Sequence, residues 1–580
     1  MNKYNWVVKT PISQAIKQQF PEIPATVLQL LYDRGLTTQQ QIDEFLHPDY
    51  SRDIHDPYLF SQMPTAVDAL YQAREKQEKL AIFGDYDADG VCGSAILHQV
   101  FTLLNFACPP LGWDFVTYLP DREKEGYGLN AAAIKNLADQ GVKLIITVDC
   151  GISNVADIEL ANSLGLRVII TDHHHVPAKI PPAIAIIHPG WDKNYPFKNL
   201  AGGGVAFKVA QALIRDPRSK IPTGQGQASE KWLLDLAAIS TVADMVPLLG
   251  ENRTIVKYGL IVLAKTKNLG LTKLMAAAAI NQEKADAITI GWQIAPRINA
   301  AGRMDHANTA YELLTTTNVE QAIVLAGQLN KRNTERQAIT EKLFNEAKQQ
   351  LGEVTPDQPV LVAVGQNWNP GIIGLVASKL TQEFARPSLV LSDQGGDSYI
   401  ASGRSIKDFD LIAALDKFKD YFLRYGGHAG AAGFSLAKAK LEDFKMAFSA
   451  YAAQVLAGST FSPTLMIDQE LTLEQVNWDL VEHLEQFKPF GENNYKPRFL
   501  LKNLEVVTAE AIGADKTHLR LLVDQGQKRE KIICFGFANV CADLRPGDQI
   551  DAVCELGINQ WNGNREIQLS LIDIKKSESI

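Results

Sequence analysis

The sequence predicts a multidomain α/β protein, and three observations lead to that prediction. Its 580 residues are enough for about three to four domains of ordinary size. In the first half, short apolar segments that end in Asp or His alternate with helical segments, a pattern typical of a parallel sheet. Near the C-terminus, short alternating segments recur at regular spacing, which favours a small β-barrel.

The predicted domain order follows from these changes in pattern. A proline-free stretch from His306 to Leu351, in which Gly327 is the single glycine, predicts a helical connector. A second α/β domain opens after it with the strand PVLVAVG. The predicted parts are a mainly helical segment at 1–75, an α/β catalytic domain at 76–305, the connector at 306–354, the second α/β domain at 355–455 and the barrel at 463–575.

Composition narrows the class of protein. Hydrophobic residues make up 46% and charged residues 21%, which is ordinary for a globular protein. The net charge of −9 argues against a general nucleic-acid coat protein, but it allows an enzyme with a basic groove. The six cysteines form no CxxC pair, so we expect reduced thiols, no structural zinc and a cytoplasmic monomer. No signal peptide or membrane span is expected.

The first chemical motif is an acidic turn in KLAIFGDYDADGVCGSAIL, Lys79 to Leu97. The segment reads as a buried strand, then a tight turn, then a helix that begins near Val91. Gly90 permits the sharp bend. The turn presents the side chains of Asp85, Asp87 and Asp89.

Two further strands end in the same way. GVKLIITVDCGIS ends at Asp149, and VIITDHHHVP ends on Asp172, His173 and His174. A His pair alone is more often part of a solvated loop than a ligand set. However, the carboxyl ends of parallel strands gather at one crevice. A fourth candidate, Asp244, lies at the polar end of the apolar helix in WLLDLAAISTVADMVPL; alone, it would more often be a turn residue.

So many acids in one crevice require cations to neutralise them. Carboxylates with one or two imidazoles suit Mn²⁺ or Mg²⁺ better than zinc. Two such ions about 3.5–4 Å apart would clamp a phosphate. The sequence therefore predicts a metal-dependent hydrolase of phosphoryl bonds.

The motifs GDYDADG, TVDCG, TDHH and STVADMVPL, in this order, resemble those of the DHH phosphoesterase superfamily. PRINAAGRM, SGRS and GGHAGAAG extend the resemblance over nearly the whole chain, to the bacterial members that degrade single-stranded DNA. The resemblance implies a DHH domain, a DHH-associated domain and an OB-fold. It also implies a 5′ to 3′ exonuclease of DNA repair and recombination, which releases mononucleotides from a 5′-phosphate end with two Mn²⁺ or Mg²⁺ ions.

The resemblance also assigns roles at the metal centre. The implied metal ligands are Asp87, Asp89, Asp149, His173, His174 and Asp244. The implied catalytic residues are Asp149 as a bridge between ions, His174 at the scissile phosphate or in a metal shell, and Asp172 as the group that orients a histidine. Some relatives carry histidine where this chain has Phe83, and Asp85 is the candidate to take that place in the first metal shell.

The implied substrate contacts lie in several motifs. Arg122 and Tyr127 offer a cation and a ring that could hold and stack a strand, although their segment reads equally well as a surface loop. By resemblance, Arg303, Ser402 and Arg404 grip the terminal 5′ phosphate, and His428 touches the strand near the scissile bond. In the tail, contacts are expected from Lys516, His518, Arg520 and Trp561.

Two other functions stay open. One is a small-molecule DHH enzyme that acts on oligoribonucleotides, cyclic dinucleotides or pyrophosphate; the added barrel argues against it. The other is a non-catalytic DNA-binding scaffold of the same fold; the retained acids argue against that. The expected partners are single-stranded DNA, a single-stranded-DNA-binding protein and a RecQ-type helicase.

Overall fold

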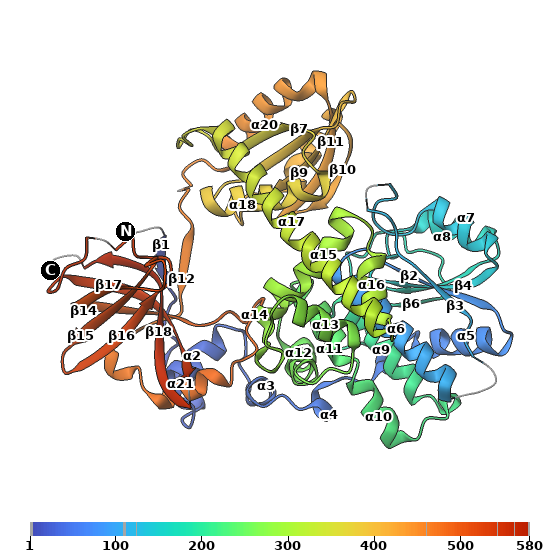
Figure 1. Cartoon of the computed structure of the whole chain (residues 1–580), viewed down its shortest axis with the longest axis horizontal. Helices are drawn as coiled ribbons and strands as arrows, with labels where there is room; N and C mark the ends of the chain where they lie inside the picture. The colour runs from blue at the N-terminus through green and yellow to red at the C-terminus, as the bar shows by residue number, and fades with distance from the viewer. Residues whose placement is uncertain are drawn as a thin grey trace. The chain divides into compact units, whose positions relative to one another are not determined.

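Figure 1 shows the whole chain as a computed structural model. The chain forms two compact units. The described residues are 4–107, 112–122, 124–459, 461–541, 543–561 and 563–577, without the side chains of Thr223 and Trp561. One unit holds residues 43–336 and 489–495. The other holds the described residues within 1–42, 337–488 and 496–580.

The first unit is built on a five-stranded sheet in the order β3-β2-β4-β5-β6, with all neighbours parallel. Its strands are β2 (Lys79–Gly84), β3 (Phe115–Tyr118), β4 (Val142–Val148), β5 (Arg167–Thr171) and β6 (Ala185–Ile187). The chain passes from β2 to β3 on one side and then crosses to β4 on the other. Ligand sites form at such a reversal, beyond the carboxyl ends of the strands.

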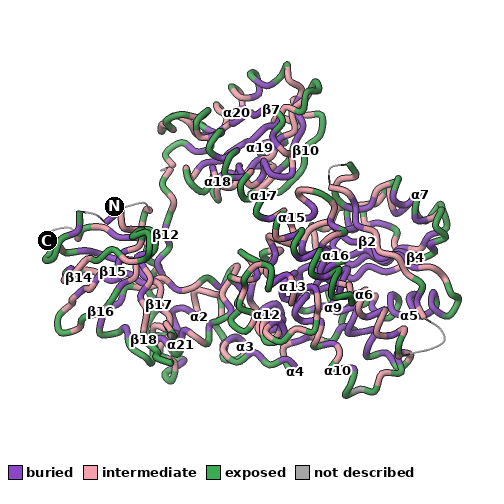
Figure 2. The backbone as a smooth tube through the Cα atoms, in the orientation of Figure 1, coloured by how far each residue is buried: buried purple, intermediate pink, exposed green. Residues whose placement is uncertain are grey.

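Helices cover both faces of this sheet. Successive side chains of a strand point to opposite faces, so Leu80 and Ile82 join one core while Ala81 and Phe83 join another. The first core is shared with α5 (Met63–Glu75), α6 (Ala88–Ala107) and α9 (Gly202–Arg215), and the second with α7 (Ala131–Asp139) and α8 (Val155–Ser163). Figure 2 shows the strands of this sheet as largely buried.

A helical layer completes the unit. It consists of α4 (Tyr50–Asp53), α10 (Thr223–Lys231), α11 (Leu234–Ala243), α12 (Gly250–Leu263), α13 (Leu269–Ala277), α14 (Ala287–Thr289), the π-helical turn η4 (Ile290–Ile294), α15 (Ala295–Met304) and α16 (Asn308–Thr315). Among the described residues, α6 is the one helix long and apolar enough to cross a membrane by length and composition. Most of α6 is buried in the core, which accounts for its apolar composition.

The segment predicted as a helical connector, 306–354, holds α16 and, after a short break, the long helix α17 (Val319–Leu351). The following five-stranded sheet has the order β10-β11-β9-β8-β7, in which only β7 and β8 are parallel. Its elements are β7 (Leu361–Gln366), α18 (Pro370–Phe384), β8 (Ser388–Asp393), β9 (Ser398–Arg404), α19 (Leu411–Lys417), β10 (Phe422–His428), β11 (Ala431–Ala437) and α20 (Leu441–Val455). This is the predicted second α/β domain.

The tail forms the predicted barrel, in the order β13-β14-β15-β16-β18-β17, closed by pairing of β14 with β17. Its elements are β13 (Gln469–Leu471), α21 (Trp478–Glu485), β14 (Arg498–Ile512), β15 (His518–Gln525), β16 (Lys528–Cys534), β17 (Gln549–Trp561) and β18 (Asn564–Lys576). The multidomain fold class is thereby confirmed.

The N-terminal segment differs in one respect from the mainly helical prediction. It holds α1 (Gln14–Gln19), α2 (Ala25–Tyr32) and α3 (Gln39–Leu46), but it begins with the strand β1 (Asn5–Val8). This strand pairs in parallel with β12 (Thr464–Ile467). A pairing partner so distant in sequence leaves no local signal, so the strand could not be predicted from its own four residues.

Candidate metal centre

The acidic turn after β2 is shaped by its backbone. The Asp85 N–H donates to the Val148 carbonyl across the neighbouring strand at 3.2 Å. A Cβ on Gly90 would lie 2.6 Å from the Asp85 nitrogen and oxygen, so only glycine allows the chain to close here. Asp87 Oδ1 accepts from the N–H groups of Asp89 at 2.9 Å and Gly90 at 3.1 Å, which caps the start of α6.

Asp89 is fixed by donors from two other helices. The N–H groups of Gly202 and Gly203, at the start of α9, donate to its two carboxylate oxygens at 2.7 Å each. The Ser240 hydroxyl of α11 also donates to it. The partial positive charge of a helix N-terminus favours a carboxylate at this place. Asp89 is thus held in one orientation while it stays buried.

Asp149 follows β4 in an unusual conformation. Its φ of +63° is in the left-handed region, which Asp and Asn tolerate better than most residues. A Cβ on Gly202 would meet the Asp149 Cβ and Oδ1 at 2.5 Å, so α9 approaches this side chain through a glycine. Asp149 Oδ1 is buried and has no hydrogen-bond partner among the described residues. Backbone strain at a buried, unsatisfied carboxylate is typical of a functional site.

His173 points its ring at three carboxylates. Its Nε2 lies 3.1 Å from Asp149 Oδ1, 3.5 Å from Asp244 Oδ2 and 3.7 Å from Asp89 Oδ2. Within the described part of the chain this Nε2 is buried without a hydrogen-bond partner. An imidazole nitrogen aimed at a group of carboxylate oxygens fits a shared cation.

His174 is held by Asp172. Its Nδ1 lies 2.8 Å from Asp172 Oδ1, which also accepts from the N–H groups of His173 and His174. Burial alone would raise the pKa of Asp172, but the His174 ring and the backbone donors lower it to about 2. Burial alone would lower the pKa of His174, but the hydrogen bond and charge of Asp172 raise it to about 9. Asp172 therefore restrains the orientation of the His174 ring.

The remaining carboxylates repel one another. Burial first, and neighbouring carboxylates second, raise the pKa of Asp85, Asp87 and Asp149 above the ordinary range. The same causes raise the pKa of Asp244 to about 9. A divalent cation would relieve both the desolvation and the repulsion. The donor set therefore fits bound cations.

The described residues include three groups of possible metal ligands. Within each group, the ligand atoms all lie within 4.8 Å of one another. The groups are Asp85 with Asp87 and Asp149, Asp89 with His173 and Asp244, and Asp149 with His173 and His174. Asp149 belongs to two of the groups, which suits a bridging role. All six residues predicted as metal ligands fall into these groups, and Asp85 joins them. Phe83 instead stacks on Tyr118 in the core, with ring centroids 5.2 Å apart.

Arg122, Tyr127 and Arg303 are placed in the same unit. The Arg122 guanidinium lies 4.8 Å from the centroid of the Tyr86 ring, within the acidic turn. The Tyr127 hydroxyl donates to the Asp149 carbonyl at 3.0 Å and lies 3.0 Å from His174 Nδ1. Arg303 lies on α15 next to Gly302, where a Cβ would lie 2.7 Å from the Tyr86 carbonyl.

Sequence reasoning missed one residue of this group, Asn299 of α15. Its Oδ1 accepts from the Ala88 N–H at 2.8 Å, which ties PRINAAGRM to the acidic turn. An Asn within that motif was the available signal.

Ser402, Arg404 and His428 lie in the other unit, where their motifs come together. Arg404 Nη1 donates to Ser402 Oγ at 3.1 Å. A Cβ on Gly374 of α18 would meet the Arg404 Nη2 at 2.9 Å and Ser402 Oγ at 3.0 Å. Ser402 also pairs with Gly433, so SGRS and GGHAGAAG occupy adjacent strands, with exposed His428 at the end of β10.

The barrel residues that were expected to contact DNA differ in their surroundings. Arg520 forms an ion pair with Glu510. His518 packs edge-to-face on Phe535, an exposed ring that sequence reasoning missed. Lys516 lies in the turn between β14 and β15. The Trp561 side chain lies outside the described residues.

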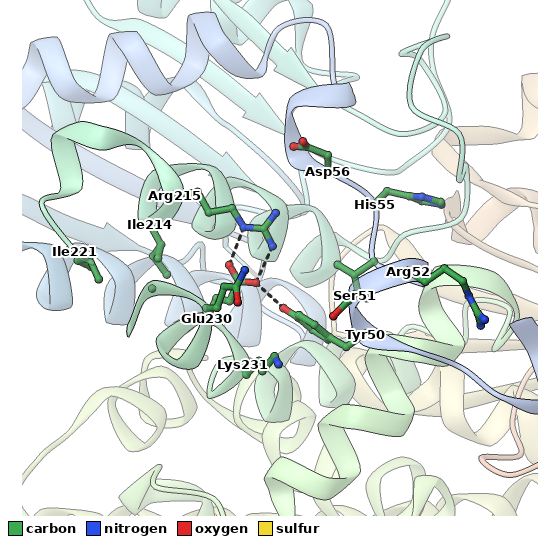
Figure 3. Close-up of a pocket in the computed structure, with 13 residues that line it drawn as sticks. Tyr50, Ser51, Arg52, His55, Asp56, Ile214, Arg215, Ile221, Glu230 and Lys231 are labelled. Carbon is green, nitrogen blue, oxygen red and sulfur yellow. Dashed lines mark hydrogen bonds and ion pairs between the residues drawn. The ribbon is translucent and has the colours of Figure 1, made fainter. Parts of the chain in front are cut away.

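A cavity of about 580 Å³ in the first unit lies between α4, α9 and α10 (Figure 3). Its buried carboxylate, Glu230, accepts hydrogen bonds from Tyr50, Gln211 and Arg215. None of the predicted site residues lines this cavity among those the structure describes. Arg215 already neutralises the Glu230 carboxylate, so we do not assign phosphoryl hydrolysis to this cavity.

Comparisons with known proteins match each domain. The DHH family N-terminal domain matches residues 79–241, the DHHA1 domain matches 357–454 and the RecJ OB domain matches 467–573. The single-stranded-DNA-specific exonuclease RecJ of Bacillus subtilis is 36% identical, over 100% of this chain and 71% of its own length. That of Haemophilus influenzae is 32% identical, over 88% of this chain and 89% of its own length.

Solved structures agree with these matches. The crystal structure of Thermus thermophilus RecJ in complex with Mn²⁺ is 27% identical, with a TM-score of 0.82, and the match covers 100% of this chain and 80% of that one. A manganese-bound exonuclease RecJ is 33% identical, with a TM-score of 0.58, over 68% of this chain and 94% of that one. The chain therefore belongs to the RecJ family of single-stranded-DNA-specific exonucleases, within the DHH superfamily.

Proposed function

We propose that this chain is a metal-dependent exonuclease that degrades single-stranded DNA 5′ to 3′ from a 5′-phosphate end and releases mononucleotides. The carrying observation is the packing of Asp149 and His173 against further carboxylates, in a cluster that repels itself without cations. The relatives are named as single-stranded-DNA-specific exonucleases, and two solved RecJ structures hold manganese.

Two ions, Mn²⁺ or Mg²⁺, would be held by Asp85, Asp87 and Asp149 on one side and by Asp89, Asp149, His173 and Asp244 on the other. When bound, they supply activation of water and charge stabilisation at the scissile phosphate. Asp149 spans both positions.

The chain's own residues orient the substrate. Asp172 holds His174 through Nδ1, so a charged ring can present Nε2–H to a phosphate oxygen. Tyr127 and Arg122 border the same crevice and suit a base and a phosphate. Arg303 in one unit, and Ser402, Arg404 and His428 in the other, are the proposed contacts to the terminal phosphate and the strand.

Four oligonucleotides test this function, labelled at either end and carrying a 5′ phosphate or a 5′ hydroxyl, with Mn²⁺ or Mg²⁺ and with EDTA. We expect release of the 5′ label first, preference for the 5′ phosphate and no activity in EDTA. Release of the 3′ label first, or cutting of circular single strands at a comparable rate, would contradict the proposal.

Asp149→Asn is the matched inactive variant. Asparagine tolerates the left-handed backbone of Asp149 and keeps its shape, while it removes the charge. We expect turnover to fall at least about a thousandfold, because metal ions supply several kcal/mol of transition-state stabilisation. Near-normal turnover by the folded variant would refute the site.

The other functions are tested in parallel. Cyclic dinucleotides and short oligoribonucleotides should be poor substrates, because the chain carries a further single-strand-binding fold. A scaffold without activity is disfavoured because the metal-ligand groups are complete.

The proposal includes a cytoplasmic monomer that works with a single-stranded-DNA-binding protein and a RecQ-type helicase. Its support is the need for an unpaired strand, which such partners expose or hold. Co-purification of either partner with the full-length chain checks it.

A further inference from the structure

Trp292 exposes an aromatic ring in an otherwise anchored turn. Its side chain is 78% exposed, whereas Ile290 and Ile294 on either side are fully buried. The three residues belong to the π-helical turn η4, which joins α14 to α15. Single π turns inside helices are frequent at functional sites. The fold therefore holds the Trp292 backbone firmly and leaves its ring uncovered by the described residues.

The turn lies against the end of the helix that delivers Asp244. A Cβ on Gly291 would lie 3.6 Å from Val242 Cγ1, and Asp244 is the C-cap of α11. Met245, the next residue, is 68% exposed and has a φ of +57°. Two exposed apolar residues thus neighbour this end of α11 in the sequence: Met245 follows Asp244, and Trp292 follows Gly291, which lies against Val242.

Helix α15, which follows the π-helical turn, reaches the acidic turn after β2. Asn299 bonds to Ala88 at the acidic turn, and Gly302 lies against Tyr86. Asn299 and Arg303 follow Trp292 by 7 and 11 residues, beyond the π-helical turn on α15. Because the rise is at most 1.5 Å per residue, Trp292 and Arg303 are no more than about 16 Å apart along the helix.

We infer that Trp292 is a substrate-positioning residue that stacks on a base of the strand, 3′ of the scissile bond. The inference rests on the proposed function, in which Arg303 contacts the 5′ phosphate. A stacked strand advances about 3.4 Å per nucleotide, so 16 Å spans no more than about five nucleotides. Stacking suits an enzyme that must accept any sequence, because every base offers a π-face.

The test compares a 5′-phosphorylated dinucleotide with a 5′-phosphorylated 12-mer. The dinucleotide includes the terminal phosphate and one scissile bond, but it is too short to reach Trp292. For Trp292→Ala we expect kcat/KM on the 12-mer to fall about 5- to 150-fold, with the dinucleotide unchanged. Trp292→Phe should retain most of the kcat/KM of the parent on the 12-mer.

Abasic residues give an independent readout. A 12-mer without bases at its third to fifth nucleotides should be cleaved equally by the parent and by Trp292→Ala. The control is Phe106→Ala, which removes an 83% exposed ring near the far end of α6 and should change neither substrate.

Equal loss on the dinucleotide and the 12-mer would mean that Trp292 acts through the fold and would overturn the inference. An unchanged 12-mer rate would overturn it too. Failure of the parent to degrade the 12-mer with metal would refute the proposed function itself, which is a separate outcome.

Discussion

Single residues at the metal centre are placed by contacts that the sequence reveals only in part. Asp87, Asp149 and His173 could be predicted because each follows an apolar strand or lies in an acidic turn. The backbone conformation of Asp149, with a φ of +63°, and the close approach of α9 to its side chain could not be predicted, since neither leaves a signal in the local sequence. Asn299 was missed because its role depends on a contact with Ala88, 211 residues away.

A buried carboxyl outside the metal centre, Asp235, gives a prediction about pH. Burial raises its pKa to about 6, against hydrogen bonds from Thr266 and the Leu236 N–H. The folded state therefore binds this proton more tightly than the unfolded chain, whose pKa is the ordinary 3.8. Stability from this group is complete below pH 3.8 and is lost as the pH rises through 6.

Asp235→Asn removes that titration. We expect the variant to be more stable than the parent at pH 8, by up to about 3 kcal/mol, with the difference vanishing near pH 4. Urea unfolding of metal-free protein at several pH values measures it. Parallel pH dependences for parent and variant would show that Asp235 is not the group responsible.

At the scale of elements, the metal centre depends on how closely α9 approaches the end of β4. The helix brings its first N–H groups to Asp89 and its Gly202 to Asp149. The sequence predicted the sheet and its acidic ends because apolar period and strand-end polarity are local signals. The contact between α9 and β4 is tertiary, and the run AGGGVAF gave no direct sign of it.

Gly202→Ala should therefore damage the site. The new Cβ would be 2.5 Å from Asp149, so either α9 or Asp149 must shift. We expect a loss of about 1–3 kcal/mol in unfolding free energy and a large fall in activity. The matched control is Gly327→Ala in α17, where a Cβ meets nothing within 4 Å. That change should stabilise the protein by about 0.5–1 kcal/mol; the same sign for both variants would contradict this account.

At the scale of the whole molecule, an acidic chain with a net charge of −9 must still bind a polyanion. Several of its buried carboxylates lie in the metal centre, where cations would offset their charge. Binding of a single strand is then expected to depend on basic side chains at particular places on the surface. Lys516, in the turn between β14 and β15 of the barrel, is one of them.

Lys516→Ala should weaken binding of a long oligonucleotide and make it less salt-dependent. Loss of one phosphate contact lowers the slope of log K against log salt by about 0.7 for a single strand. Titrations at several salt concentrations measure the slope. The control is Lys143→Ala. Lys143 lies near the start of β4, at the opposite end of this strand from Asp149. Equal slopes for parent and Lys516→Ala would exclude that contact.

The parallel pairing of β1 with β12 also has a consequence for how the chain is made. Asn5 pairs with Thr464, so β1 leaves the ribosome well before the partner strand that lies far downstream in the sequence. Until then it is an unpaired strand edge, a surface that invites association with other chains. The entropic cost of closing a loop grows only slowly with loop length. The delay before β1 pairs is therefore set more by the order of synthesis than by the cost of closing the loop. Strand β1 therefore cannot pair until β12 has been synthesised.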